Sequence, residues 1–253
     1  MDDKLDTGVA GLDAALVGGF PRGNLVLLSG GAGTGKSTFC LHFLLAGAAR
    51  GEKGVYVTTE QDEAELEKQA GRYSMPLRQF VSEGVIKIVY VDVLKDEQIV
   101  GRLVNEVRSF GASRAVIDSL STFSEFSSAS EIARDILLTR GGVATRNVDL
   151  IVPQNVTEKT MVKRMLGLLI STFKSLGVTM LLTSELPEKG EALSSDGVSE
   201  FLVDGVLVLQ HLGVGLSQFR SLQVRKMRYS MHSNEVFGYD FRQHGIEFVE
   251  NAV

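Results

Sequence analysis

The chain has 253 residues, of which 44% are hydrophobic, so it is long enough to bury a sizeable α/β core. Its net charge of −5 at pH 7 argues against binding of nucleic acid or anionic membranes by the whole surface. The single cysteine, Cys40, excludes an intrachain disulfide framework and a cysteine-based zinc site. Because the sequence has no signal-peptide pattern and no apolar run of the ~18 residues that span a bilayer, we expect a cytoplasmic protein without membrane contact.

The first informative feature along the chain is a complete phosphate-binding loop, G-x-x-x-x-G-K-[ST], over residues 30–37. It follows an apolar run of strand length at 23–29 and precedes a helical pattern over 38–50, which is the context that the motif needs. In such loops the backbone N–H groups cradle a polyphosphate, the lysine contacts the β- and γ-phosphates, and the hydroxyl binds Mg²⁺. A glycine-rich turn without a ligand is the alternative. The expected nucleotide-binding residues are Gly31, Ala32, Gly33, Thr34, Gly35, Lys36, Ser37 and Thr38, with Lys36 also catalytic.

Apolar strand-like runs alternate with helical patterns after this loop. We expect strands at 54–59, 85–91, 114–118 and 178–183, with helices that start near residue 62 and cover 96–110. Repeated strand–helix units predict a mostly parallel sheet with helices on both faces. Short runs separated by turn residues near the C-terminus predict antiparallel strands at 206–209, 222–224 and 236–241.

Two carboxylates follow strands that should end at the same sheet edge as the phosphate loop. Asp118 closes the strand at 114–118, and we expect it to hold Mg²⁺ opposite Ser37. Glu60 follows the strand at 54–59, where it could orient or deprotonate the attacking water; a helix-capping or surface role is its alternative. The neighbouring Gln61 is neutral and cannot act as a base.

A stretch around 140–161 does not fit a minimal strand–helix unit, because it carries Gly, Pro and Asn residues with little periodicity. Residues 139–165 have five basic and two acidic side chains, which could contact a partner or a nucleic acid, or could belong to an ordinary solvated insertion. With no linker or internal repeat, we expect one domain over 1–253 with a surface insertion around 140–161.

The chain also carries a specific combination of segments, which are residues 7–13, 18–23, 51–52, 56–60, 116–120, 182–185 and 226–228, with His232. Together they resemble the KaiC-like branch of the RecA superfamily of P-loop ATPases, over nearly the full length. The resemblance implies a RecA-type core that binds ATP and Mg²⁺ at the junction between neighbouring subunits of a homo-oligomer, usually a hexamer.

Carried over residue by residue, the resemblance makes Glu60 the first of a glutamate pair that serves as catalytic base, with Gln61 in place of the second. Lys226 and Arg228 match a basic finger that reaches the γ-phosphate held by the next subunit. Such fingers contribute roughly 10³–10⁵ in rate in related chemistry. Arg220 and His232 are expected as further nucleotide or interface contacts.

A departure from the clock protein of this family concerns autophosphorylation. The segment at 197–205 has Glu200 and Phe201 where that protein carries hydroxyl residues, so we do not expect autokinase activity.

Three functions remain open from the sequence. The first is a slow, oligomeric ATPase whose nucleotide state controls assembly or a protein partner. The second is a recombination modulator of the RadA-paralog kind that binds single-stranded DNA; its support is the basic excess of 139–165, where the aromatic residues that usually stack on bases are absent. The third is a scaffold in which ATP joins subunits without hydrolysis. The partner, the ring size and the effect of Gln61 on turnover are not determined by the sequence.

Overall fold

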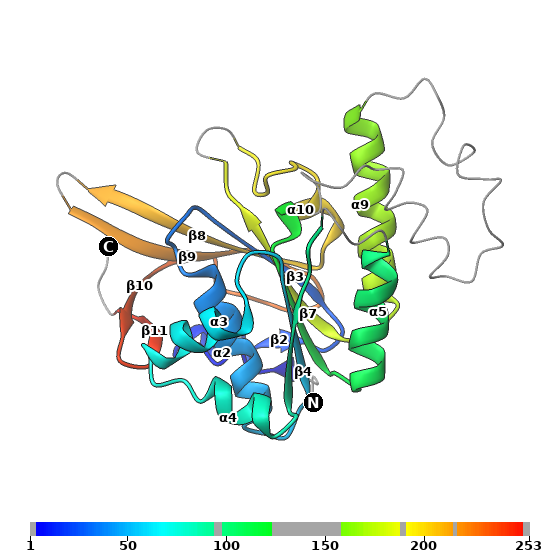
Figure 1. Ribbon diagram of the computed structural model, residues 1–253. Helices are drawn as coiled ribbons and strands as arrows, with labels where there is room; N and C mark the ends of the chain where they lie inside the picture. Colours follow the sequence, from blue (N-terminus) through cyan, green and yellow to red (C-terminus); the bar gives the residue numbers. More distant parts are fainter. Residues whose placement is uncertain (1–3, 94–97, 123–157, 188–190, 215–216, 250–253) are drawn as a thin grey trace.

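A nine-stranded sheet runs through the centre of the protein, in the order β11-β10-β9-β8-β3-β7-β6-β4-β5 (Figure 1). The computed structural model describes residues 4–93, 98–122, 158–187, 191–214 and 217–249. The strands are β3 (Leu25–Gly30), β4 (Gly54–Thr58), β5 (Ile86–Tyr90), β6 (Arg114–Asp118), β7 (Thr179–Glu185), β8 (Gly205–Val214), β9 (Ser217–Met227), β10 (Val236–Arg242) and β11 (Gly245–Phe248).

The central strands are parallel. β3 pairs with β7 and β8, β6 pairs with β7, and β4 pairs with β5 and β6, all in parallel register. β3 and β4 are buried along their whole length, as is usual for strands covered on both faces. The predicted α/β class with a mostly parallel sheet and C-terminal antiparallel strands is therefore confirmed.

Helices cover both faces of this sheet (Figure 1). One face carries α2 (Lys36–Ala48), α3 (Glu63–Gly71) and α4 (Leu77–Ser82), and the other carries α5 (Ile99–Phe110) and α9 (Glu158–Lys174). Two separate hydrophobic clusters fill the two interfaces. The acidic start predicted near residue 62 is a capping box, in which Asp62 and Glu65 each accept a backbone N–H from the other.

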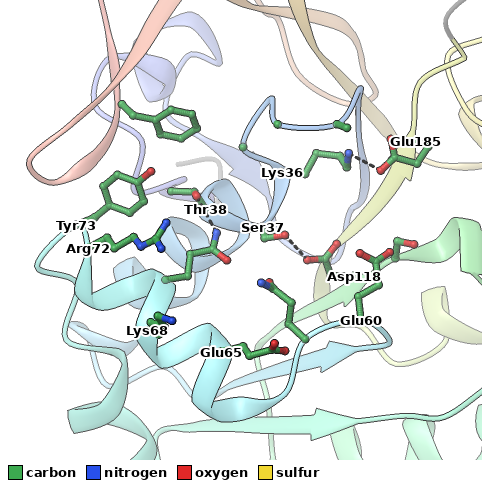
Figure 2. A pocket seen from close by; sticks show the side chains of 17 residues that line it. Lys36, Ser37, Thr38, Glu60, Glu65, Lys68, Arg72, Tyr73, Asp118 and Glu185 are labelled. Carbon is green, nitrogen blue, oxygen red and sulfur yellow. Dashed lines mark hydrogen bonds and ion pairs between the residues drawn. The ribbon is translucent and has the colours of Figure 1, made fainter.

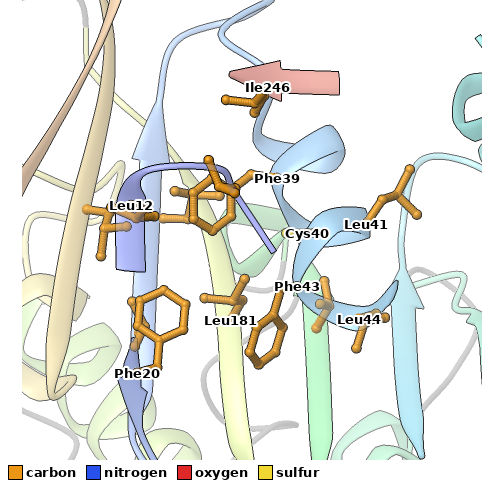
Figure 3. Packing of buried hydrophobic residues seen from close by; sticks show 14 of the residues in the cluster. Leu12, Phe20, Phe39, Cys40, Leu41, Phe43, Leu44, Leu181 and Ile246 are labelled. Carbon is orange, nitrogen blue, oxygen red and sulfur yellow. The ribbon is translucent and has the colours of Figure 1, made fainter. Parts of the chain in front are cut away.

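The helix after the phosphate loop is packed on several sides at once. Phe39, Cys40, Phe43 and Leu44 of α2 are fully buried, and Figure 3 shows them packed beside the strands of the sheet, with Ile246 of β11 near the start of the helix. Contacts on several sides fix the position of the helix start, and with it the phosphate loop. Short elements complete this side; they are β1 (Lys4–Leu5), α1 (Leu12–Ala15) and β2 (Phe20–Pro21), and the sequence pattern did not predict them.

The C-terminal strands are longer than predicted. β8 pairs antiparallel with β9 from Gly205 to Val214, whereas β3 accompanies β8 only as far as Leu209. Beyond that point the pair is a two-stranded ribbon that projects from the body of the protein (Figure 1). Polar residues interrupt the apolar run in this ribbon. The hydrophobic pattern from which the strands were predicted is therefore weaker where the strands leave the core.

Residues 140–157 of the expected insertion around 140–161 lie outside the described residues. Residues 158–161 form the first turn of α9.

His42 joins α2 to the C-terminal hairpin. Its Nε2 accepts the backbone N–H of Ile246 at 2.9 Å. Burial lowers the pKa of His42 from 6.5 to about 4, while its hydrogen bond with the backbone of Gly8 acts weakly in the opposite direction. The imidazole is therefore neutral in the folded protein at pH 7.

This geometry predicts acid sensitivity of the fold. Between pH 6.5 and 4 the unfolded chain binds a proton at His42 that the folded chain does not, so stability falls as pH falls through this window, by up to about 3 kcal/mol. Urea unfolding at pH 7, 6, 5 and 4 would measure it. The His42→Gln variant keeps an acceptor but does not titrate, so it should lose less stability on acidification; an equal loss would contradict the assignment.

Candidate functional site

The phosphate loop lies where β3 turns into α2. Gly33 and Gly35 have φ of 73° and 99°, in the left-handed region that glycine adopts readily. A Cβ on Gly35 would also lie 2.5 Å from the Phe241 ring, so a side chain is excluded there twice over. Within the described part of the chain, no side chain caps α2 and its first turn carries no acidic residue. The positive end of the helix is thus available to an anion.

Lys36 is held at the mouth of this loop. Its Nζ donates to the carbonyl of Gly30 at 2.7 Å and forms an ion pair with Glu185 Oε1, also at 2.7 Å (Figure 2). Glu185 ends β7 directly beside Gly30 in the parallel register, and its side chain is half exposed. An entering phosphate therefore has to compete with a carboxylate for the ammonium group. No role was predicted for Glu185.

Ser37 and Asp118, the two residues expected to hold Mg²⁺, are hydrogen-bonded to each other. The Ser37 hydroxyl donates to Asp118 Oδ2 at 2.7 Å (Figure 2). Asp118 accepts two further hydrogen bonds, from the Tyr56 hydroxyl to Oδ2 at 2.7 Å and from Thr183 Oγ1 to Oδ1 at 2.5 Å. Neither of these donors was predicted, because their roles depend on strands that become neighbours only in the folded sheet.

The oxygen atoms of Ser37 and Asp118 fit a magnesium ion that is shared with a nucleotide. Mg²⁺ prefers one or two protein oxygens together with phosphate oxygens and water. In the part of the chain that the structure describes, no group of three or more His, Cys, Asp or Glu side chains could hold a metal. A metal bound jointly with phosphate suits this donor set, whereas a protein-only metal centre does not.

A cavity of about 680 Å³ opens over the loop, which is a size suited to a nucleotide. Predicted residues that line it are Ala32, Gly33, Gly35, Lys36, Ser37, Thr38, Glu60 and Asp118. Gly31 and Thr34 shape the loop instead, because Thr34 Oγ1 donates to the carbonyl of Gly31 at 2.8 Å. Glu60 lines the cavity together with Gln61, at the edge of the sheet where β4 ends (Figure 2).

The opposite wall was not predicted. It comes from Lys68 and Gln69 of α3, from Arg72 and Tyr73 in the turn directly after this helix, and from Phe241 of β10 (Figure 2). The Tyr73 and Phe241 rings stack with centroids 5.7 Å apart and an interplanar angle of 24°. This end of the cavity offers aromatic faces and cations, in contrast to the hydroxyl and carboxylate groups beside Ser37. The i, i+4 spacing of Lys68 and Arg72 was visible in the sequence, but it did not show which way that face points.

Arg220 lies behind the aromatic wall of its own chain. Its guanidinium carbon is 4.7 Å from the centroid of the Phe241 ring, and its Nη1 is 3.3 Å from Asp240 Oδ1. It supports the cavity wall from outside and does not line the cavity. His232, expected as another contact, is not among the lining residues either; its Nδ1 is 3.0 Å from the carbonyl oxygen of Ser233.

Lys226 and Arg228 lie near the amino-terminal end of the parallel strands, whereas their own phosphate loop lies at the carboxyl end. Lys226 pairs with Val206 near the start of β8, whereas the end of β3 is level with Leu209. Lys226 Nζ donates to carbonyls at the short helix α10 (Ser199–Leu202) and beyond it; they belong to Glu200, Phe201 and Val203. Burial, and then the charge of Arg228, lowers the pKa of Lys226.

Arg228 converges on the same turn. Its Nη2 donates to the carbonyl of Phe201 at 3.4 Å, and its Nη1 lies 3.6 Å from Asp204 Oδ1. The Phe201 side chain beside them is 70% exposed. The pair of cations and this exposed ring form one surface, remote from the cavity of the same chain.

No helix in the described ranges is long and apolar enough to cross a membrane.

Comparison with known proteins gives a consistent family. The family model described as "ATPase: KaiC" matches residues 5–140 and 142–253. A UPF0273 protein of Aeropyrum pernix is 30% identical over 270 residues, which cover 100% of this chain and 93% of that protein. The circadian clock protein KaiC3 of Synechocystis is 29% identical over 94% of this chain, which spans only 43% of that relative's length.

A solved structure agrees with the same fold. The KaiC-like protein of Pyrococcus horikoshii superposes with a TM-score of 0.76 at 29% identity, covering 99% of this chain and 100% of that one.

The Lys36–Glu185 pair predicts that a neutral residue at 185 strengthens phosphate binding. Glu185→Gln frees Lys36 from a competing charge and removes a carboxylate from beside the incoming anion, so ADP should bind several-fold more tightly in EDTA. Isothermal titration calorimetry would measure the affinity. Glu235→Gln, an exposed carboxylate that does not line the cavity, is the control for the charge change. Weaker binding by Glu185→Gln would contradict the competition.

Proposed function

Since the chain belongs to the KaiC family of ATPases, we propose that it binds Mg·ATP in the cavity over the phosphate loop and hydrolyses it slowly, as one ATPase domain of a homo-oligomer. The observation that carries the proposal is the convergence of Lys36, Ser37 and Asp118 on one cavity of about 680 Å³ at the start of α2. This set supplies a cation for the phosphates and oxygen ligands for the metal.

Each residue of the set has its own task in the proposed reaction. The loop N–H groups and Lys36 bind the phosphates and neutralise the charge that develops on the γ-phosphoryl group. Ser37 and Asp118 would hold Mg²⁺, which would supply positive charge next to the phosphates when bound. Glu60, on the wall beside them, orients a water and accepts its proton. Gln61 next to it can only hydrogen-bond, which supports slow turnover.

The far end of the cavity would take the nucleoside. The stacked pair of Tyr73 and Phe241 offers an apolar aromatic wall against which a purine base would pack, and Arg220 stacks on Phe241 from behind and fixes its ring. Lys68 of α3 and Arg72 directly after it add positive charge to the cavity lining near this wall.

A neighbouring copy would complete the site. Lys226 and Arg228 are too far along the sheet to reach their own phosphate loop, so a role at the γ-phosphate requires another subunit's cavity. The first turn of α3 is acidic, with Glu63 and with Glu65, which lines the cavity, and it complements this basic surface in charge. We therefore propose a nucleotide-dependent oligomer, with a hexamer as the expected form, that acts as a regulator or assembly switch.

The other two functions have less support. Binding of single-stranded DNA rests on the basic excess of residues 139–165, most of which the structure does not describe. A scaffold that holds ATP without hydrolysis rests on Gln61 alone. The experiments on hydrolysis distinguish this scaffold from the ATPase.

The first experiment separates binding from hydrolysis. Lys36→Ala should lose both nucleotide affinity and phosphate release. Glu60→Gln should keep the affinity but lower phosphate release by about 100-fold or more, because the base is neutralised in place. Phosphate release and calorimetry on the same samples measure the two properties. Phosphate release at the wild-type rate in Glu60→Gln would refute the assigned base. If the wild-type protein binds nucleotide but releases no phosphate, the scaffold would be favoured.

The second experiment tests completion by a neighbour. The double variant Lys226→Ala/Arg228→Ala should lose roughly 10³–10⁵ in phosphate release while it keeps an intact phosphate loop. Mixed with inactive Lys36→Ala protein, it should regain activity, because some junctions then combine a normal loop with a normal finger. Phosphate release as a function of mixing ratio is the measurement. If mixtures release phosphate no faster than the two variants do separately, the shared site is refuted.

A further inference from the structure

A buried tyrosine hydroxyl lies on the carboxylate that we assign to magnesium. Tyr56 is in the middle of β4, pairs with Val116 of β6 and is fully buried among hydrophobic side chains. Its hydroxyl reaches Asp118 at the carboxyl end of the neighbouring strand β6 and donates to Oδ2 at 2.7 Å. A phenylalanine would fill the same apolar space, so the hydroxyl adds a polar contact that packing does not need.

The arrangement around Asp118 gives this contact a specific consequence. Ser37 and Tyr56 donate to Oδ2, and Thr183 donates to Oδ1 at 2.5 Å. Under the proposed function, the Ser37 hydroxyl would serve as a ligand of the metal and would no longer donate to Asp118. The donors that remain on the carboxylate are then Tyr56 and Thr183, one on each oxygen, and together they determine the plane of the carboxylate.

The tyrosine is a donor under all ordinary conditions. Burial raises the pKa of Tyr56 well above its usual value, and the negative charge of Asp118 raises it further. Its hydroxyl therefore keeps its proton and orients it towards the carboxylate, instead of ionising beside it.

We propose that Tyr56 is a positioning residue for Mg²⁺, which orients Asp118 towards the metal through its buried hydroxyl. This inference rests on the proposed function, because it assumes that Asp118 serves a metal bound with the nucleotide. Partners that orient metal ligands typically contribute about 10–100-fold to metal affinity or activity. The effect should therefore appear in the metal dependence of nucleotide binding, even without turnover.

The test compares nucleotide binding with and without metal in Tyr56→Phe. Affinity for a fluorescent ADP analogue is measured in EDTA and in a Mg²⁺ titration. In EDTA the variant should bind like wild type, because the phosphate loop is unchanged. The Mg²⁺ concentration that gives half of the metal-dependent gain should rise about tenfold.

Two further variants make the result specific. Thr172→Val removes another buried hydroxyl, which donates to the carbonyl of Leu168 at 2.8 Å within α9 and does not line the cavity, and it should leave the Mg²⁺ midpoint unchanged. Thr183→Val removes the donor on the other oxygen of Asp118, and it should shift the midpoint in the same direction as Tyr56→Phe. If Tyr56→Phe does not fold, as judged by circular dichroism, the Thr183→Val result decides: a shifted midpoint supports orientation by the strand donors.

A wild-type midpoint in Tyr56→Phe, or in Thr183→Val where that variant decides, would overturn the inference. An equal shift in Thr172→Val would also overturn it, because the effect would then not pass through Asp118. Failure of the proposed hydrolysis has a different signature: Mg²⁺-dependent binding without phosphate release in wild type removes the ATPase but leaves the positioning role. Wild-type binding that is indifferent to Mg²⁺ removes both.

Discussion

The parallel register of four strands is the constraint on which this site depends. It aligns Gly30 with Glu185 on β3 and β7, and Thr58 with Asp118 on β4 and β6, so that groups far apart in sequence reach one edge of the sheet together. Backbone hydrogen bonds between the strands hold these alignments. A slip by one residue is unfavourable, because it would turn each apolar side chain to the other face of the sheet. The chemistry at the edge therefore inherits its precision from the core beneath it, where α2 packs on the same strands.

This constraint explains how much could be predicted from sequence. The phosphate loop is local, and the meeting of Ser37 with Asp118 follows from the rule that parallel strands end at a common edge. The aromatic wall was not predictable in the same way. Phe241 reaches Tyr73 only because β10 joins the sheet beyond β9 and β8, and no periodicity encodes which ring a distant strand will meet. The length of the β8–β9 ribbon was missed because its outer part lacks the apolar alternation of a buried strand.

The basic residues predicted together differ in position and environment. Arg220 sits level with Tyr239 on β10, beside the cavity of its own chain, whereas Lys226 lies near the start of β8 and folds onto the carbonyls after α10. Arg220 and Lys226 were expected at the same site because of the family resemblance. They are six positions apart on β9, and six positions along an extended strand correspond to roughly 20 Å. That separation gives one strand two environments, one that supports a ring and one that presents cations at a distant surface.

The distance between the cavity and the Lys226–Arg228 surface also has a geometric consequence for assembly. Two surfaces that differ and lie apart on one molecule can only join head to tail, which is a heterologous contact. Copies joined in this way either curve round into a closed circle or extend as an open row. In the proposed arrangement an open row leaves the cavity at one end without its partner's cations, and closure alone gives every copy an equivalent junction. The curvature between successive copies would thus set how many junctions work at once.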